Sequence, residues 1–245
     1  MSGIQYGRRG FMGMPPVVLN LIIINTLFLL ITFMFQDKIN LYNVLGLFYI
    51  SSENFQTWQF VSYMFMHGDF THLLFNMFAL WMFGAVLEQL WGGKRFLTFY
   101  MVTGIGAGLV QLLVAFLRIQ SLEGAISPAN LQEVYANGHE LWIQGKTYSD
   151  AAMAALHQIL NVPTVGASGA VFGILLAFGM LFPNTLIYVF FAIPVKAKYF
   201  VMIYGVAELY FGVTGTQEGI AHFAHLGGMV FGFFMIKYWR KKGVY

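Results

Sequence analysis

Cysteine is absent from this chain of 245 residues, and charged residues make up only 9% of it. Without cysteine the chain can have neither a disulfide framework nor thiol chemistry. An ordinary soluble domain carries roughly 25% charged residues. This low share of charge, together with 58% hydrophobic residues, excludes an ordinary soluble domain. The net charge of +3 gives no indication of nucleic-acid binding. At this length the composition predicts one integral membrane domain.

Six apolar runs are candidates for membrane-spanning helices, because a span needs about 20 apolar residues. We interpret the first run as a retained helix and not as a cleaved signal peptide. The mixed segment at 36–66 is expected in the membrane interface, and the long polar interval at 118–162 is expected to form an external insertion. The six predicted spans are 17–35, 71–87, 96–117, 168–182, 199–213 and 220–236.

Short signals subdivide the chain between these spans. A Ser-Pro pair at 127–128 predicts the start of a short helix, and an Asn-Gly pair at 137–138 predicts its end. A Ser-Asp pair at 149–150 predicts a second helix that runs to about Ile159. The apolar stretch at 185–193 is too short to cross the bilayer alone.

Lysine and arginine are distributed unevenly between the two sides of the predicted membrane protein. Six spans put both termini on one side, which holds ten basic residues, whereas the other side holds three. Cytoplasmic loops carry an excess of such residues, so we expect both termini in the cytoplasm and the chain in the cell (inner) membrane. The expected organisation is a cytoplasmic segment at 1–16, a six-helix domain at 17–236 and a basic cytoplasmic tail at 237–245. The ten are Arg8, Arg9, Lys94, Arg95, Lys196, Lys198, Lys237, Arg240, Lys241 and Lys242, and the three are Lys38, Arg118 and Lys146.

The small-residue motif Gly166-Ala167-Ser168-Gly169 lies at the start of the fourth predicted span. It fits two interpretations. Small residues let transmembrane helices pack closely, and for this motif alone packing is the commoner explanation. A serine flanked by glycines can also act as a nucleophile, because backbone N–H groups can then approach a developing oxyanion.

Polar residues from three spans are predicted to lie at one depth, because the second, fourth and sixth spans all run from outside to inside. Polar groups at such a depth are costly to leave unpaired and are therefore functional candidates. Neutral imidazole suits a base near neutral pH, and amide, imidazole and helix-start N–H groups suit an oxyanion. Each residue alone also fits a structural role, but the set together favours a catalytic site. The residues are His72 and Asn76, Ser168, and His225, which shares a helix face with Gly228 and Gly232.

Three motifs in this order resemble the rhomboid family of intramembrane serine proteases. They are HGDFTHLLFN at 67–76, GASG at 166–169 and AHLGGMVFG at 224–232. The resemblance covers roughly residues 15–240. It implies an all-α bundle of six transmembrane helices that hydrolyses peptide bonds in or near transmembrane segments of other proteins.

The resemblance also implies a role for each site residue. Ser168 would be the nucleophile and His225 the general base, in a dyad with no carboxylate as a third member. His72, Asn76 and the Ser168 backbone N–H would form the oxyanion hole. Phe172, one turn after the serine, would pack beneath the catalytic imidazole. The glycines expected to pack the site are Gly166, Gly169, Gly228 and Gly232.

One position departs from the family pattern. Trp58 is followed by Gln59, where the family usually has arginine. This departure puts the anchoring of the external segment in question more than it does activity.

Two acidic residues and four histidines carry other interpretations. Glu208, in the fifth predicted span, could orient an imidazole, but we interpret it as a helix-packing residue. We interpret Glu88, near the cytoplasmic end of the second predicted span, as an interfacial residue. A metal site is disfavoured because no His-Glu-x-x-His pair is present, and no cofactor is implied. The histidines considered for such a site are His67, His72, His222 and His225.

The main alternative to a protease is a rhomboid-like scaffold that binds transmembrane partners without cutting them. The intact serine and histidine pair argues against it. A small-solute channel is disfavoured because the polar residues stop at one depth and do not line a path. We expect transmembrane protein substrates and the lipid bilayer as partners, and no nucleic acid; the sequence gives no indication of the oligomeric state.

Overall fold

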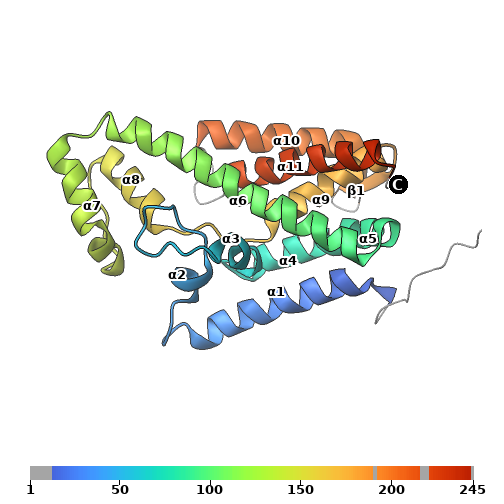
Figure 1. The fold of residues 1–245 in the computed structure, drawn as a ribbon, viewed down its shortest axis with the longest axis horizontal. Helices are drawn as coiled ribbons and strands as arrows, with labels where there is room; N and C mark the ends of the chain where they lie inside the picture. The colour runs from blue at the N-terminus through green and yellow to red at the C-terminus, as the bar shows by residue number, and fades with distance from the viewer. Residues whose placement is uncertain (1–12, 190–191, 216–220, 244–245) are drawn as a thin grey trace, which may run out of the picture.

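The computed structural model describes residues 13–189, 192–215 and 221–243, which form a mostly helical, elongated bundle (Figure 1). Most of the predicted segment at 1–16, the first residue of the sixth predicted span and the last two residues of the predicted tail lie outside these ranges. The helices and strands are α1 (Pro16–Phe35), α2 (Leu41–Leu45), α3 (Gln59–Ser62), η2 (Tyr63–Phe65), α4 (Phe70–Ala79), η3 (Leu80–Gly84), α5 (Ala85–Trp91), α6 (Gly93–Glu123), α7 (Pro128–Ile143), α8 (Ala151–Asn161), α9 (Ser168–Leu181), β1 (Leu186–Val189), β2 (Ile193–Lys196), α10 (Ala197–Thr214) and α11 (His222–Lys241).

Three helical segments in the described ranges are long and apolar enough to cross a membrane, namely α1, the continuous segment Phe70–Trp91 and α6. They correspond to the first three predicted spans, so the chain is a helical membrane protein. The apolar helix α9 is shorter, with 14 residues. It lies with α10 and α11 where the last three spans are predicted, and the count of six crossings stays a prediction.

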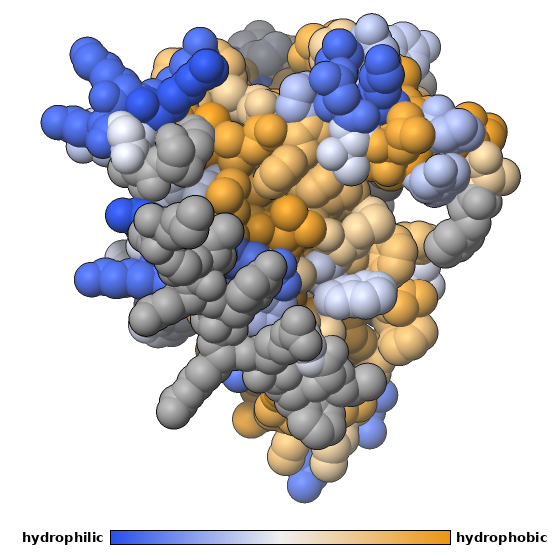
Figure 2. All heavy atoms as spheres, turned by 90° about the vertical axis from the view of Figure 1, so that its right-hand side faces the viewer, coloured by the Kyte–Doolittle hydropathy of each residue, from blue (hydrophilic) through white to orange (hydrophobic). Residues whose placement is uncertain are grey.

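The two ends of the helical core lie at the same end of the bundle, where α1 begins and α11 finishes (Figure 1). The helices α7 and α8 lie at the opposite end, beyond the others. Figure 2 looks onto the end that holds both termini and shows hydrophilic side chains along its edges, beside a broad apolar surface. An even number of crossings requires this arrangement of the termini, but the side that faces the cytoplasm stays a prediction.

Helix α9 is the centre of the bundle and packs against α6, α10 and α11. Most of its residues are buried, on every side of the helix. A helix that is apolar all round is stable only where protein or lipid surrounds it. The fold therefore places Ser168, its first residue, within the protein.

The interval at 118–162 is largely helical. Ser127 accepts a hydrogen bond from the backbone of α7, and Asp150 caps α8 in the same way, which confirms both predicted helix starts. The predicted end of α7 at 137–138 is wrong, because the helix continues to Ile143. Gly138 instead lets α8 approach, since a Cβ there would lie 3.2 Å from the His157 ring. The helix ends where Gly145 adopts a φ of 67°, a conformation that glycine adopts without strain.

One stretch has a structure that the sequence did not assign, and one further helix end differs from the prediction. The stretch at 185–193 contributes to an antiparallel hairpin of β1 and β2, in which Leu186 pairs with Lys196. Helix α11 continues to Lys241, past the expected end at 236. Its last turn contains Arg240 and Lys241, and positive charge is favourable near a helix C-terminus.

Glu88, interpreted from the sequence as an interfacial residue, is buried in the protein and caps another helix; its depth in the membrane stays a prediction. It lies in α5 with 4% of its surface exposed. Its two carboxylate oxygens accept hydrogen bonds from the backbone of Val17 and Val18, at 3.0 and 2.8 Å. A carboxylate is stabilising at a helix N-terminus because N–H groups there have no partner within the helix.

Gln59 is fully buried and ties together the segment at 36–66. Its oxygen accepts from the backbone N–H groups of Phe48 and Gln56, and its amide donates to the Asn54 carbonyl at 2.8 Å. The neighbouring Trp58 donates its indole N–H to the Val44 carbonyl. Glutamine therefore supplies, by its own hydrogen bonds, the local anchoring that the departure from Trp-Arg put in question.

Candidate active site

Ser168 is the first residue of α9 and follows a backbone conformation that requires glycine. Gly166 has a φ of 131°, and a Cβ at this position would lie 2.9 Å from the His72 imidazole. That same Cβ would lie 3.4 Å from the Ser168 Oγ. The imidazole and the hydroxyl thus border one small space, next to the free N–H groups of a helix start.

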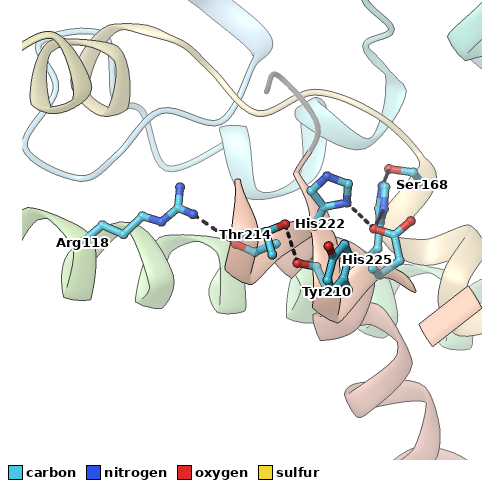
Figure 3. Close-up of polar contacts among 8 residues, drawn as sticks. Arg118, Ser168, Tyr210, Thr214, His222 and His225 are labelled. Carbon is cyan, nitrogen blue, oxygen red and sulfur yellow. Dashed lines mark hydrogen bonds and ion pairs between the residues drawn. The ribbon is translucent and has the colours of Figure 1, made fainter. Parts of the chain in front are cut away.

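The structure brings Ser168 and His225 together, although they are far apart in the sequence. The hydroxyl oxygen lies 2.8 Å from Nε2 of the imidazole, which is a hydrogen-bonding distance (Figure 3). His225 is the fourth residue of α11 and is 9% exposed. Phe172 stacks on its ring with centroids 4.2 Å apart and planes 3° from parallel, as the resemblance implied. This stacking fixes the plane of the imidazole.

Close packing of α11 on α9 makes the contact possible. A Cβ on Gly228 would collide with the carbonyl oxygen of Gly169, so the two backbones touch. One turn further, a Cβ on Gly232 would lie 3.3 Å from the Cα of Gly173. Two of the four predicted packing glycines, Gly228 and Gly232, therefore lie along one seam that only residues without a side chain fit. Gly166 faces His72 instead, and a Cβ on Gly169 would collide with the side chain of Ala107 in α6.

His72 lies in the first turn of α4 and is oriented by two residues just before that helix. Asp69 caps the helix by accepting the His72 backbone N–H at 2.8 Å, and the Gly68 N–H points at Nδ1 over 3.4 Å. If Nδ1 accepts this bond, Nε2 carries the proton. That N–H lies on the side of Gly166 and Ser168, where an oxyanion hole needs a donor.

Asn76 lies one turn after His72 and is 6% exposed. Its amide donates to the His72 carbonyl at 2.9 Å. Among the described residues it has no hydrogen bond to Ser168. The structure therefore places Asn76 beside the site, with part of its amide already occupied.

Glu208 is the site residue whose position the sequence did not reveal. It lies in α10, 8% exposed, and its Oε2 is 2.9 Å from Nδ1 of His225 and 2.6 Å from Nδ1 of His222. The expected dyad without a carboxylate is therefore incomplete as a description of this geometry. Its sequence signal is an acidic residue inside an apolar run, which fits both helix packing, the interpretation preferred above, and a group that orients an imidazole.

The same three side chains are the one group in the described ranges that could hold a metal ion. The ligand atoms of Glu208, His222 and His225 lie within 4.8 Å of one another. Two N–H···O hydrogen bonds account for the arrangement equally well, because each distance suits a direct bond. The other two histidines considered, His67 and His72, contact each other edge-on but do not join this cluster.

Comparison with known proteins identifies the family. The family model described as the Rhomboid domain matches residues 54–242. Rhomboid protein 1, mitochondrial, of Saccharomyces cerevisiae is 29% identical over 69% of this chain and 38% of its own length. RHOMBOID-like protein 12, mitochondrial, of Arabidopsis thaliana is 27% identical over 93% of this chain and 60% of its own length.

A bacterial relative is named as a protease. Rhomboid protease AarA of Providencia stuartii is 26% identical over 71% of this chain and 53% of its own length. The chain thus spans between 38% and 60% of the length of these three relatives. Since the family model covers more than half of the chain, the chain belongs to the rhomboid family.

Proposed function

We propose that the protein is an intramembrane serine endopeptidase in which Ser168 is the nucleophile and His225 is the general base. The observation that carries this proposal is the 2.8 Å contact between the hydroxyl oxygen and Nε2, at the start of a buried apolar helix. A serine alcohol becomes an effective nucleophile only when a base accepts its proton, and imidazole is suited to that task.

The reaction follows from this geometry as acyl transfer. The Ser168 oxygen attacks the peptide carbonyl while its proton passes to Nε2 of His225, which later delivers it to the leaving amine. The negative charge that develops on the carbonyl oxygen is stabilised by the Ser168 backbone N–H, the His72 imidazole N–H and the Asn76 amide. Water then attacks the acyl-enzyme and regenerates the serine.

The proposed substrates are transmembrane segments of other proteins, cut in or near the membrane. The site lies among apolar helices, next to the external segment at 36–66: Tyr63 of that segment accepts the Gly166 N–H through its backbone carbonyl. A peptide entering there meets an apolar surface and the catalytic groups together. The relative AarA, named a protease, supports this class of activity.

The proposed placement is a six-span protein with both termini in the cytoplasm. The cell membrane expected from the sequence matches the bacterial origin of one relative. The mitochondrial names of the yeast and plant relatives point to an organelle membrane instead. The catalytic proposal is the same for either membrane.

The rival function is a non-catalytic scaffold that holds transmembrane partners. It uses the same apolar surfaces but needs no hydrogen bond between serine and histidine. The presence of that bond, with Phe172 stacked on the imidazole, favours the protease.

Cleavage of a fluorescent transmembrane peptide by the purified protein in detergent tests the proposal. We expect Ser168→Ala and His225→Ala each to abolish turnover while the protein stays folded. The two losses should not add, because residues that act as a unit are strongly non-additive. A double variant far slower than either single variant would contradict the pairing, and full turnover in Ser168→Ala would show that another group is the nucleophile. No turnover by the wild-type protein would favour the scaffold.

A further inference from the structure

We propose that Glu208 is the positioning residue of the catalytic histidine, so that the site is a carboxylate–imidazole–hydroxyl triad in which Glu208 orients His225 and takes up no proton. The inference rests on the proposed function. Glu208 touches neither Ser168 nor the space where a substrate carbonyl would lie, and it acts only through His225.

The first step of the argument concerns the tautomer of His225. An ionised carboxylate can only accept hydrogen bonds, so Nδ1 of His225, 2.9 Å away, must be the nitrogen that carries the proton. In a neutral imidazole the other nitrogen, Nε2, then has a free lone pair. It faces the Ser168 hydroxyl at 2.8 Å and is the correct acceptor for the hydroxyl proton. Glu208 thereby selects the reactive tautomer.

The second step concerns charge. When the proton moves from Ser168 to Nε2, His225, the fourth residue of α11, becomes a cation at the end of the first turn of that helix. The positive end of the helix dipole lies there and disfavours a cation. The adjacent carboxylate offsets this effect and keeps its own negative charge, since the proton passes on to the leaving amine and not to Glu208.

The third step concerns how the carboxylate is held in place. His222 lies three residues before His225, so both rings project from one face of α11 toward α10 (Figure 3). Its Nδ1 is 2.6 Å from the same Oε2 that His225 contacts. A buried carboxylate is stable only when donors satisfy it, and two N–H groups from one helix turn do so here. These two hydrogen bonds also hold Oε2 of Glu208 in its position next to His225.

The test compares variants of Glu208 by turnover of the fluorescent transmembrane peptide and by their reaction rate with an alkyl fluorophosphonate. Glu208→Gln keeps the size and one acceptor oxygen but removes the charge, and we expect turnover to fall by up to about 10⁴-fold with little change in KM, because the wrong tautomer of His225 is favoured. Glu208→Asp keeps the charge and should recover part of that loss. The phosphonylation rate of Ser168 should fall in parallel.

A matched control separates positioning from general stability. Glu88→Gln also neutralises a buried carboxylate, but one that caps α1 away from the site. We expect it to lower the melting temperature and to leave turnover per folded molecule within about twofold, by the additivity of distant sites.

The ¹⁵N shifts of the histidine rings give a readout that a purely structural role would not move. In histidine-labelled wild type, His225 should carry its proton on Nδ1, whereas Glu208→Leu should give a mixture of tautomers. Unchanged tautomer and unchanged turnover in the Glu208 variants would overturn the inference. Loss of wild-type activity on dialysis against a chelator would overturn it as well, by identifying the carboxylate as a metal ligand.

The outcome for Glu208 is distinguishable from the outcome for the proposed function. If wild type neither cleaves the peptide nor reacts with the probe at Ser168, the proposed function fails. If wild type does both and Glu208→Gln matches it, the protease stands and only the role of Glu208 is wrong.

Discussion

His67 is a buried polar residue beside the candidate site that the proposed chemistry does not use. It lies just before α4, outside the apolar segment Phe70–Trp91, and only 1% of its surface is exposed. Its ring meets that of His72 edge-on, with centroids 5.0 Å apart. Burial lowers the pKa of His67 to about 3, because an imidazolium would lose its hydration there. A neutral neighbour leaves His72 free to serve as a hydrogen-bond donor without charge repulsion.

This residue makes the stability of the protein depend on acidity. Between pH 6.5 and about 3 the unfolded chain binds a proton on His67 that the folded protein does not. The free energy of unfolding should therefore fall as pH decreases through this range, by up to about 1.4 kcal/mol per pH unit, with no contribution from His67 above it. We expect His67→Phe to lose less of its melting temperature than wild type between pH 7 and pH 5. An equal loss in both proteins would show that His67 is not the group responsible.

Among the helices, the seam between α9 and α11 is the contact on which the site depends most. A Cβ at Gly228 would overlap the Gly169 carbonyl oxygen, so even alanine must push the helices apart. Overpacking of this kind costs about 1–3 kcal/mol, and a shift of about 1 Å at a reacting pair can slow it about 10²-fold. We expect Gly228→Ala to be folded, less heat-stable and strongly impaired in cleavage.

Gly205 in α10 provides the matched control for that substitution. A Cβ there would meet only the flexible end of Met229, 3.3 Å away. Gly205→Ala should therefore keep turnover and melting temperature, both measured at one scan rate. Gly227 is a poorer control, because its Cβ would lie 2.7 Å from Val110 of α6. Equal behaviour of Gly228→Ala and Gly205→Ala would mean that the seam is not as tight as described.

The start of α1 depends on a residue from another helix. Glu88→Ala would leave the backbone N–H groups of Val17 and Val18 without their acceptor. Loss of a helix cap costs about 0.5–2 kcal/mol, and burial should place this one at the upper end. We expect a lower melting temperature, with Glu88→Gln intermediate because an amide keeps one acceptor oxygen. A variant as stable as wild type would show that the first helix does not need this cap.

The element boundaries show what sequence patterns can and cannot predict. The capped starts of α7 and α8 were predictable because the capping side chain is local. The end of α7 was not, because Gly138 serves a contact with His157 of another helix. The hairpin of β1 and β2 was missed because a short apolar run has no periodicity that separates a strand from a helix.

The same distinction applies to the site. Topology predicted that Ser168 and His225 would meet, because it places them at one depth. The stacking of Phe172 on His225 was implied only by the resemblance to the family. The motifs do not include Glu208, which from the sequence alone could either orient an imidazole or pack a helix. Its partners are set by how α10 packs against α11. The role of an acidic residue in an apolar helix can be assigned only when the side chains that contact it are known.

For the whole molecule, orientation in the membrane is the property that the sequence predicts and the fold leaves open. Lys146 follows α7 at one end of the bundle, and Lys241 ends α11 at the other; both are exposed. The chain has no cysteine, so single cysteines can be read without interference. We expect Lys146→Cys and Lys241→Cys to react with an impermeant thiol reagent from opposite faces of the membrane, with Lys241→Cys reached only from the cytoplasm. Labelling of both in intact cells would refute the six-span topology.

The central claim, that Ser168 is an activated nucleophile, is tested most directly by locating the adduct of an alkyl fluorophosphonate by peptide mass spectrometry. The account predicts a single adduct on Ser168, absent from Ser168→Ala and formed far more slowly in His225→Ala. An adduct on another residue, or equal labelling of wild type and Ser168→Ala, would contradict it.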